Sequence, residues 1–174
     1  MTDFIQIGKK ITYLLRHNPE DLIMDKNGYV DVLSLLKKVN ITQENLDFIV
    51  ETNDKKRLAY SADKKRIRAS QGHSINVDVQ LKSTIPPNVL YHGTSPENYK
   101  KIIKSKGLSK MKRLYVHLTD DKDTAYNVGK RYSKYVEPII IEIDSCSMYN
   151  DKYKFYKSEN NVWLTDNIPL KYIK

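Results

Sequence analysis

The 174-residue sequence has a single cysteine, Cys146, and no long apolar run. One cysteine cannot form an internal disulfide or build a multi-thiolate metal site, so it indicates a reducing compartment. No apolar stretch approaches the roughly 20 residues of a membrane-spanning helix. At the N-terminus, Lys9 and Lys10 follow the apolar residues, which reverses the charge order of a secretory signal. We therefore expect a soluble, cytoplasmic protein.

Common nucleotide and metal motifs are also missing. The chain contains neither Gly-x-Gly-x-x-Gly nor a Walker loop, so a nucleotide would not be held in a Rossmann or P-loop manner. Its four histidines include no pair at helical ligand spacing. The run Asp121-Lys-Asp123 lacks the glycine and final glutamate of a calcium loop, and a serine or cysteine nucleophile has no local support. We expect no metal.

Basic residues outnumber acidic ones. Lys and Arg total 30 against 21 Asp and Glu, a formal net charge of +9, which favours a polyanionic partner such as nucleic acid. Residues 1–87 carry 14 basic and 11 acidic side chains, and residues 88–174 carry 16 and 10. Because both halves are ordinary charged sequence, the excess does not indicate a disordered basic tail.

The first residues predict a helix. Thr2 can cap it, and its apolar residues have roughly helical spacing: Ile5, Ile7, Ile11, Leu14 and Leu15. Pro19 disfavours helix at the residue before it, so this helix should end near Arg16-His17. A guanidinium and an imidazole then lie at a helix C-terminus, where the helix dipole stabilises positive charge.

Two further helices and a hairpin follow. Asp31 and Thr42 can each cap a short amphipathic helix. Residues 58–61 and 65–69 predict two strands joined by a short turn, and the second strand alternates basic and apolar residues. Helices followed by a hairpin are typical of a winged helix, a common nucleic-acid-binding module.

Pro86-Pro87 is the best candidate domain boundary, which predicts domains at 1–85 and 88–174. Ser95 with Pro96 should open a helix that Gly107 closes. Asp120 or Asp121 can cap a helix that runs toward Gly129. The predicted strands are 89–91, 114–118, 139–143, 155–156 and 162–164. The second half should be a β-rich α+β unit with little helix after Arg131.

The most concentrated chemistry lies in residues 66–74. Two arginines, His73, Gln71 and Ser74 surround Gly72, with no carboxylate to neutralise them. Arginine can hold a phosphate through two hydrogen bonds, and glycine lets the backbone approach a ligand closely. The alternative reading is a solvated basic strand followed by a turn.

Two other histidines are candidates for function. His92 lies at the end of a predicted strand, and a lone histidine there is more often structural. His117 lies between Val116 and Leu118, so if those apolar residues face inward it faces the other side of the sheet and can line a cleft. The alternative for His117 is a surface histidine.

Together, six sequence blocks resemble the RNA 2′-phosphotransferases, also called tRNA 2′-phosphotransferases. They occur in family order across nearly the whole chain: Leu14-Leu15-Arg16-His17, Arg66-Ile67-Arg68-Ala69-x-Gln71-Gly72-His73-Ser74, Leu90-Tyr91-His92-Gly93-Thr94, Val116-His117-Leu118, Val128-Gly129-Lys130-Arg131 and Phe155-Tyr156-x-Ser158-Glu159-Asn160-x-Val162-Trp163-Leu164-Thr165. One block alone is weak evidence, but six in register are highly specific.

The resemblance implies an α+β protein with an N-terminal winged-helix lobe, a C-terminal lobe of the ADP-ribosyltransferase fold, and an active site between them. It matches Arg16, His17, Arg68 and Arg131 to the family's catalytic set. In that set the arginines face the transferring phosphate, and His17 either transfers protons or only positions the substrate.

The resemblance also implies that NAD is consumed as a co-substrate. His92, His117 and Val162 match the signature around which the NAD pocket is built, and Gly93 and Thr94 belong to the same block. Gln71, His73 and Ser74 are expected to contact substrate phosphate or ribose, unless they only shape the turn.

Three positions depart from the family pattern. Ser70 stands where Asn is common, and Tyr132 where His is frequent. Asn161 stands where Gly is usual, so the shape of the loop beside Val162 is open to question.

The implied reaction removes an internal 2′-phosphate from RNA, as in tRNA splicing. It passes through an RNA-2′-phospho-ADP-ribose intermediate and gives 2′-OH RNA, nicotinamide and ADP-ribose 1″,2″-cyclic phosphate. We expect a monomer, although the sequence leaves the oligomeric state open. Two alternatives remain: an ADP-ribosyltransferase that caps phosphate ends of RNA or DNA, and a non-catalytic winged-helix nucleic-acid binder.

Overall fold

The structure, a computed structural model, describes residues 3–53, 55–133 and 135–174. The chain is a mixed α/β protein that divides into two compact units, Met1–Gln80 (unit 1) and Leu81–Lys174 (unit 2). Each unit has its own hydrophobic core. The division falls shortly before Pro86-Pro87. No helix within the described ranges is both long and apolar enough to cross a bilayer.

In unit 1, residues 3–53 and 55–80 form three helices and a small antiparallel sheet. The helices are α1 (Phe4–Arg16), α2 (Val32–Val39) and α3 (Gln43–Glu51). The strands are β1 (Val30–Asp31), β2 (Leu58–Tyr60) and β3 (Arg66–Ala69), in the order β1-β3-β2.

Side-chain caps define where these helices begin. Asp31 and Thr42 cap α2 and α3 as predicted, because each side chain accepts a backbone N–H three residues ahead. At α1 the cap is Asp3, whose carboxylate accepts the N–H of Gln6 at 3.0 Å. The predicted cap, Thr2, lies outside the described residues. The helix ends at Arg16, as predicted.

The predicted hairpin is confirmed. Strands β2 and β3 pair antiparallel with Leu58 opposite Ala69 and Tyr60 opposite Ile67. Ile67 and Ala69 are buried in the unit 1 core, where Leu14 of α1 is also buried. Burial of each large aliphatic side chain contributes about 2 kcal/mol, so α1 is held against the sheet that carries the candidate arginines.

The described residues of unit 2 form three antiparallel sheets. They are the pair β4 (Val89–Thr94) and β7 (Ile139–Asp144), the pair β5 (Gly107–Leu108) and β10 (Ile168–Pro169), and the set β6 (Val116–Leu118), β9 (Trp163–Thr165) and β8 (Phe155–Lys157). The helices are α4 (Pro96–Lys104), α5 (Lys122–Lys130), α6 (Ser145–Asn150) and the 3₁₀ turn η1 (Leu170–Tyr172).

The structure corrects two expectations for unit 2. His92 lies within β4, not at its end, because β7 supplies a partner for every residue from Val89 to Thr94. Helix α4 ends at Lys104, and Gly107 instead begins β5, where it pairs with β10. Little helix follows Arg131, as predicted: within the described residues it is limited to α6 and η1.

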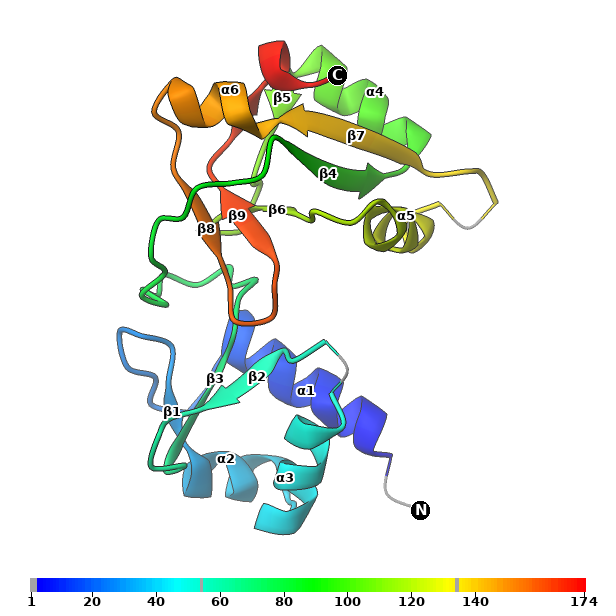
Figure 1. Ribbon diagram of the computed structural model, residues 1–174. Coiled ribbons are helices and arrows are strands. Elements are labelled where there is room, and N and C mark those ends of the chain that lie inside the picture. The colour runs from blue at the N-terminus through cyan, green and yellow to red at the C-terminus, as the bar shows by residue number, and fades with distance from the viewer. Residues whose placement is uncertain (1–2, 54, 134) are drawn as a thin grey trace. The chain divides into compact units, whose positions relative to one another are not determined.

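Glycine lets α5 pack directly on β4 (Figure 1). A Cβ atom on Gly93 would lie 1.7 Å from the carbonyl oxygen of Ala125 in α5 and 2.8 Å from the backbone nitrogen of Gly129. Only glycine fits where two backbones approach this closely. The Gly-Thr pair that resembled the end of a strand is therefore a helix-packing site inside one.

Candidate active site

In unit 1, the end of α1 is tied to the segment that follows β3. The backbone N–H of Ser74 donates to the carbonyl oxygen of Arg16 at 2.9 Å. The hydroxyl of Ser74 also lies 2.9 Å from Nδ1 of His17, which caps the C-terminus of α1. Two of the sequence blocks are thus joined by a backbone and a side-chain hydrogen bond, although His17 and Ser74 are 57 residues apart in the chain.

Gly72 allows the Arg16 guanidinium to lie against this segment. Its φ angle is +90°, a conformation that side chains other than glycine rarely adopt. A Cβ atom there would lie 3.2 Å from Cζ of Arg16. The glycine in this block therefore serves both the turn and the placement of the arginine.

Arg68 is held inside unit 1 and not on its surface. Only 9% of the residue is exposed, and its Nη1 donates to the carbonyl oxygen of Val79 at 3.4 Å. Its Cζ lies 4.7 Å from the centroid of the Tyr29 ring, a cation–π contact. Arg66, two residues earlier, is exposed and pairs with Asp25 at 2.9 Å. The two arginines of β3 therefore have different environments.

His73 lies at the centre of these groups. It is 1% exposed, and its Nε2 has no hydrogen-bond partner in the described structure. Burial lowers its pKa to about 4, and the positive charges of Arg16, Arg68 and His17 add to the decrease. His73 is therefore neutral at pH 7. Each of these three side chains is therefore close enough to His73 to disfavour its protonated form.

In unit 2, two strands bring His92 and His117 together. Nδ1 of His92 lies 3.0 Å from the carbonyl oxygen of His117. A carbonyl oxygen only accepts, so Nδ1 carries the proton and Nε2 of the neutral ring is left as an acceptor. Burial lowers the pKa of His92 and so favours this neutral form. His92 can thus accept a hydrogen bond from a sugar hydroxyl, which fits a ribose-bearing ligand such as NAD.

His117 projects from the face of β6 opposite the core, as predicted. Val116 and Leu118 are buried, whereas His117 is half-buried. Its Nδ1 lies 3.3 Å from Nη1 of Arg113. Arg113 therefore adds a guanidinium next to the histidine signature.

The loop before β9 is closed by hydrogen bonds and has asparagine at position 161. Ser158 and Val162 exchange backbone and side-chain hydrogen bonds of 2.9 to 3.1 Å, which close a tight loop. Asn161 has a φ angle of +60°. Glycine is favoured in this left-handed region, and asparagine tolerates it better than most other residues. The departure at Asn161 is thus compatible with the loop that carries Val162.

The remaining candidates of unit 2 lie on β4 and α5. Thr94 is buried at the end of β4, next to Gly93 and its contact with α5. Arg131 follows α5 as its C-terminal cap and is exposed. Each unit therefore groups its own share of the predicted residues.

Comparisons with known proteins identify a family that matches nearly the whole chain. The model of the RNA 2′-phosphotransferase, Tpt1/KptA family, matches residues 2–167. The chain is 49% identical over 175 residues to a protein of Flavobacterium johnsoniae, covering 97% of this chain and 94% of that one. It is 46% identical over 182 residues to a protein of Fusobacterium nucleatum, covering 100% and 99%. Both relatives bear the name "Probable RNA 2'-phosphotransferase".

The chain belongs to the RNA 2′-phosphotransferase family. The resemblance seen in the six sequence blocks is confirmed, and the family is one of transferases whose name implies an RNA substrate. Because coverage is nearly complete in both directions, the family assignment includes both units.

The structure adds residues to the RNA 2′-phosphotransferase motifs that sequence reasoning missed. Tyr29 lies under Arg68, and Arg113 lies beside His117. Tyr29 follows the Asn-Gly turn and carries no signal of its own, whereas Arg113 precedes the Val-His-Leu block by three residues. In the part of the chain that the structure describes, no group of three or more His, Cys, Asp or Glu side chains is placed to hold a metal.

Proposed function

We propose that this protein removes an internal 2′-phosphate from RNA and consumes NAD as a co-substrate. The observation that supports the proposal most strongly is the grouping of Arg16, His17 and Arg68 around His73 in unit 1. A phosphate dianion near this cluster would gain charge-assisted hydrogen bonds without a metal. Membership of a family named for RNA 2′-phosphotransfer supplies the substrate class.

In the first step, an oxygen of the RNA 2′-phosphate attacks C1″ of the nicotinamide ribose. The new O–C1″ bond forms as the C1″–N bond breaks, and neutral nicotinamide leaves. The nucleophile is anionic and the carbon is cationic in character, so orientation is the main demand. We assign ribose and nicotinamide recognition to His92, Gly93, Thr94, His117 and Val162, on the basis of the acceptor Nε2 of His92 and the tight Val162 loop.

In the second step, the ribose 2″-hydroxyl attacks the phosphorus. The bond from phosphorus to the RNA 2′-oxygen breaks, which releases 2′-OH RNA and ADP-ribose 1″,2″-cyclic phosphate. Arg16, Arg68 and Arg131 stabilise the charge on the phosphoryl oxygens. His17 moves the proton from the 2″-hydroxyl to the departing 2′-oxygen, because an imidazole can both accept and donate a proton, and Ser74 holds its Nδ1.

Gln71 and Ser74 would contact the phosphate or ribose of the RNA. His73, which is buried, would pack behind them and hold them in position. We further assign unit 1 to a winged-helix lobe and unit 2 to an ADP-ribosyltransferase-like lobe. The support is the helix-helix-helix-hairpin order of unit 1 and the two histidine-bearing strands of unit 2.

Single-turnover assays of three arginine and histidine variants test the mechanism. With a 2′-phosphorylated oligoribonucleotide and NAD, His17→Ala and Arg68→Ala should slow the second step and accumulate RNA-2′-phospho-ADP-ribose. Arg66→Ala is the matched control, because Arg66 is on the same strand and also contacts Tyr29 but is exposed and paired with Asp25. It should retain near wild-type turnover.

Full activity of either Ala variant at His17 or Arg68 would refute the assignment. Nicotinamide release without cyclic phosphate, by the wild-type protein, would instead select an ADP-ribosyltransferase that caps phosphate ends.

A further inference from the structure

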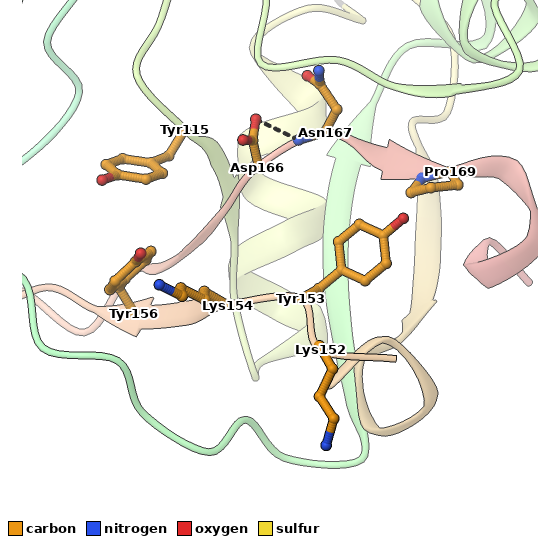
Figure 2. A pocket seen from close by; sticks show the side chains of 8 residues that line it. All are labelled: Tyr115, Lys152, Tyr153, Lys154, Tyr156, Asp166, Asn167 and Pro169. Carbon is orange, nitrogen blue, oxygen red and sulfur yellow. Dashed lines mark hydrogen bonds between the residues drawn. The ribbon is translucent and has the colours of Figure 1, made fainter. Parts of the chain in front are cut away.

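Unit 2 contains a hollow of about 490 Å³ that none of the assigned residues line. Its walls include Tyr115, Tyr153, Lys154, Tyr156, Asp166 and Pro169, and we call it the tyrosine pocket. Figure 2 shows Tyr115, Tyr156 and Lys154 at one end, and Tyr153 with Pro169 at the other. The pocket therefore presents aromatic rings and an amine to the same space.

The register of the three-stranded sheet connects this pocket to a candidate active-site residue. His117 of β6 is opposite Leu164 of β9, and Leu164 is opposite Tyr156 of β8. Directly opposed residues share a face, so His117 and Tyr156 project from the same side of the sheet. Two strand spacings separate them, roughly 10 Å.

Tyr115, immediately before β6, places a second aromatic ring beside that of Tyr156. It lies two residues before His117 in the chain, and its ring centroid is 5.4 Å from that of Tyr156, with the planes tilted by 55°. The two rings therefore form a continuous apolar surface on the face of the sheet from which His117 projects.

The charge of the pocket favours an anionic ligand. Asp166 is an acidic residue in the wall of the pocket, but its carboxylate forms an ion pair with Lys110 at 3.0 Å, which offsets its negative charge. Lys154 points along the wall toward Tyr156 in Figure 2. A ligand with a flat ring and a phosphate could stack on tyrosine and place its negative charge near the Lys154 amine.

We propose that the tyrosine pocket binds a nucleotide of the single-stranded RNA that flanks the 2′-phosphate. The inference rests on the proposed function, which places the reacting nucleotide near His117. Any base can stack on tyrosine, because every base has a π-face. Lysine contacts the phosphate charge of the RNA backbone, which is the same at every nucleotide. The pocket thus extends the RNA-binding site without adding sequence specificity.

Substrates of two lengths separate this pocket from the reaction centre. One is a 2′-phosphorylated dinucleotide and the other a 2′-phosphorylated single-stranded oligoribonucleotide of about ten nucleotides. Tyr115→Ala and Tyr156→Ala should raise KM for the long substrate about tenfold, the effect expected of one lost stacking contact. They should leave kcat, KM for the dinucleotide and KM for NAD unchanged. Tyr156→Phe keeps the ring and should behave as wild type.

A charge reversal provides a test that does not disturb packing. Lys154→Glu should raise KM for the long substrate and reduce its dependence on salt concentration. Lys100→Glu, an equal change of charge at an exposed position of α4 outside the pocket, is the control and should change KM less. Thermal melts of all variants identify any that fail to fold.

An equal rise of KM for both substrate lengths, or no rise for either, would overturn the proposal. A rise of KM for NAD alone would assign the pocket to the adenosine of the co-substrate. Quenching of a 2-aminopurine base in the long strand reports binding without turnover. If the wild-type protein showed no NAD-dependent phosphate removal, loss of this quenching in Tyr115→Ala would still support the pocket, and unchanged quenching would reject it.

Discussion

His73 should make the stability of this protein depend on pH in a defined window. Its pKa is about 4 in the folded protein, against an ordinary value of 6.5, because the imidazole is buried and faces three cationic side chains. Between these two values the unfolded chain binds the proton more tightly than the folded one. The stabilising contribution of the neutral ring is therefore complete above pH 6.5 and is lost as the pH falls toward 4.

The magnitude follows from the two pKa values. Lowering the pH from 7 to 5 should cost about 2 kcal/mol of unfolding free energy through His73 alone. The loss should approach about 3 kcal/mol below pH 4, at 1.36 kcal/mol for each unit of pKa difference. Replacement by glutamine removes the titration but keeps a polar side chain of similar length.

Urea unfolding at several pH values measures this effect. The difference in unfolding free energy between wild type and His73→Gln should change by about 2 kcal/mol between pH 7 and pH 5, in the direction that favours the variant at low pH. The carboxylates titrate in both proteins and cancel in the difference. A constant difference across this range would refute the conclusion that His73 is buried in its neutral form.

Substitutions at three further positions test local parts of unit 2. Gly93→Ala should destabilise the protein by about 3 kcal/mol or prevent folding, because the added Cβ would overlap the backbone of Ala125. A melting temperature equal to that of wild type would contradict this packing. Asn161→Ala should cost about 1 kcal/mol of stability while Asn161→Gly costs less, and equal melts would reject the left-handed loop. The indole N–H of Trp163 is the largest cause of the lowered pKa of Asp120, so Trp163→Phe should raise that pKa in an NMR titration, and an unchanged value would exclude the hydrogen bond.

Local signals predicted most of the secondary structure. The caps at Asp31, Thr42 and Ser95 and the hairpin of β2 and β3 depend on neighbouring residues, so the sequence is sufficient to find them. The errors involve distant partners. Strand β4 continues through Gly93 because β7 and α5 stabilise it, and neither partner can be identified from the residues around Gly93.

The candidate residues were predictable by type, but their environments were not. Arg66 and Arg68 are equivalent in an alternating basic strand, yet only Arg68 is buried, and it donates to the carbonyl oxygen of Val79. His73 looked like a substrate contact in the sequence, and its burial beside the arginines depends on how α1 packs against β3. Such environments arise from contacts between residues far apart in the chain, which the composition and spacing of neighbouring residues do not predict.

The most direct test of the proposed reaction is to incubate the wild-type protein with a 2′-phosphorylated oligoribonucleotide, with and without NAD, and resolve all products. The account predicts 2′-OH RNA, nicotinamide and ADP-ribose 1″,2″-cyclic phosphate in equal amounts, and only when NAD is present. Phosphate removal without NAD, or release of inorganic phosphate in place of the cyclic product, would contradict it.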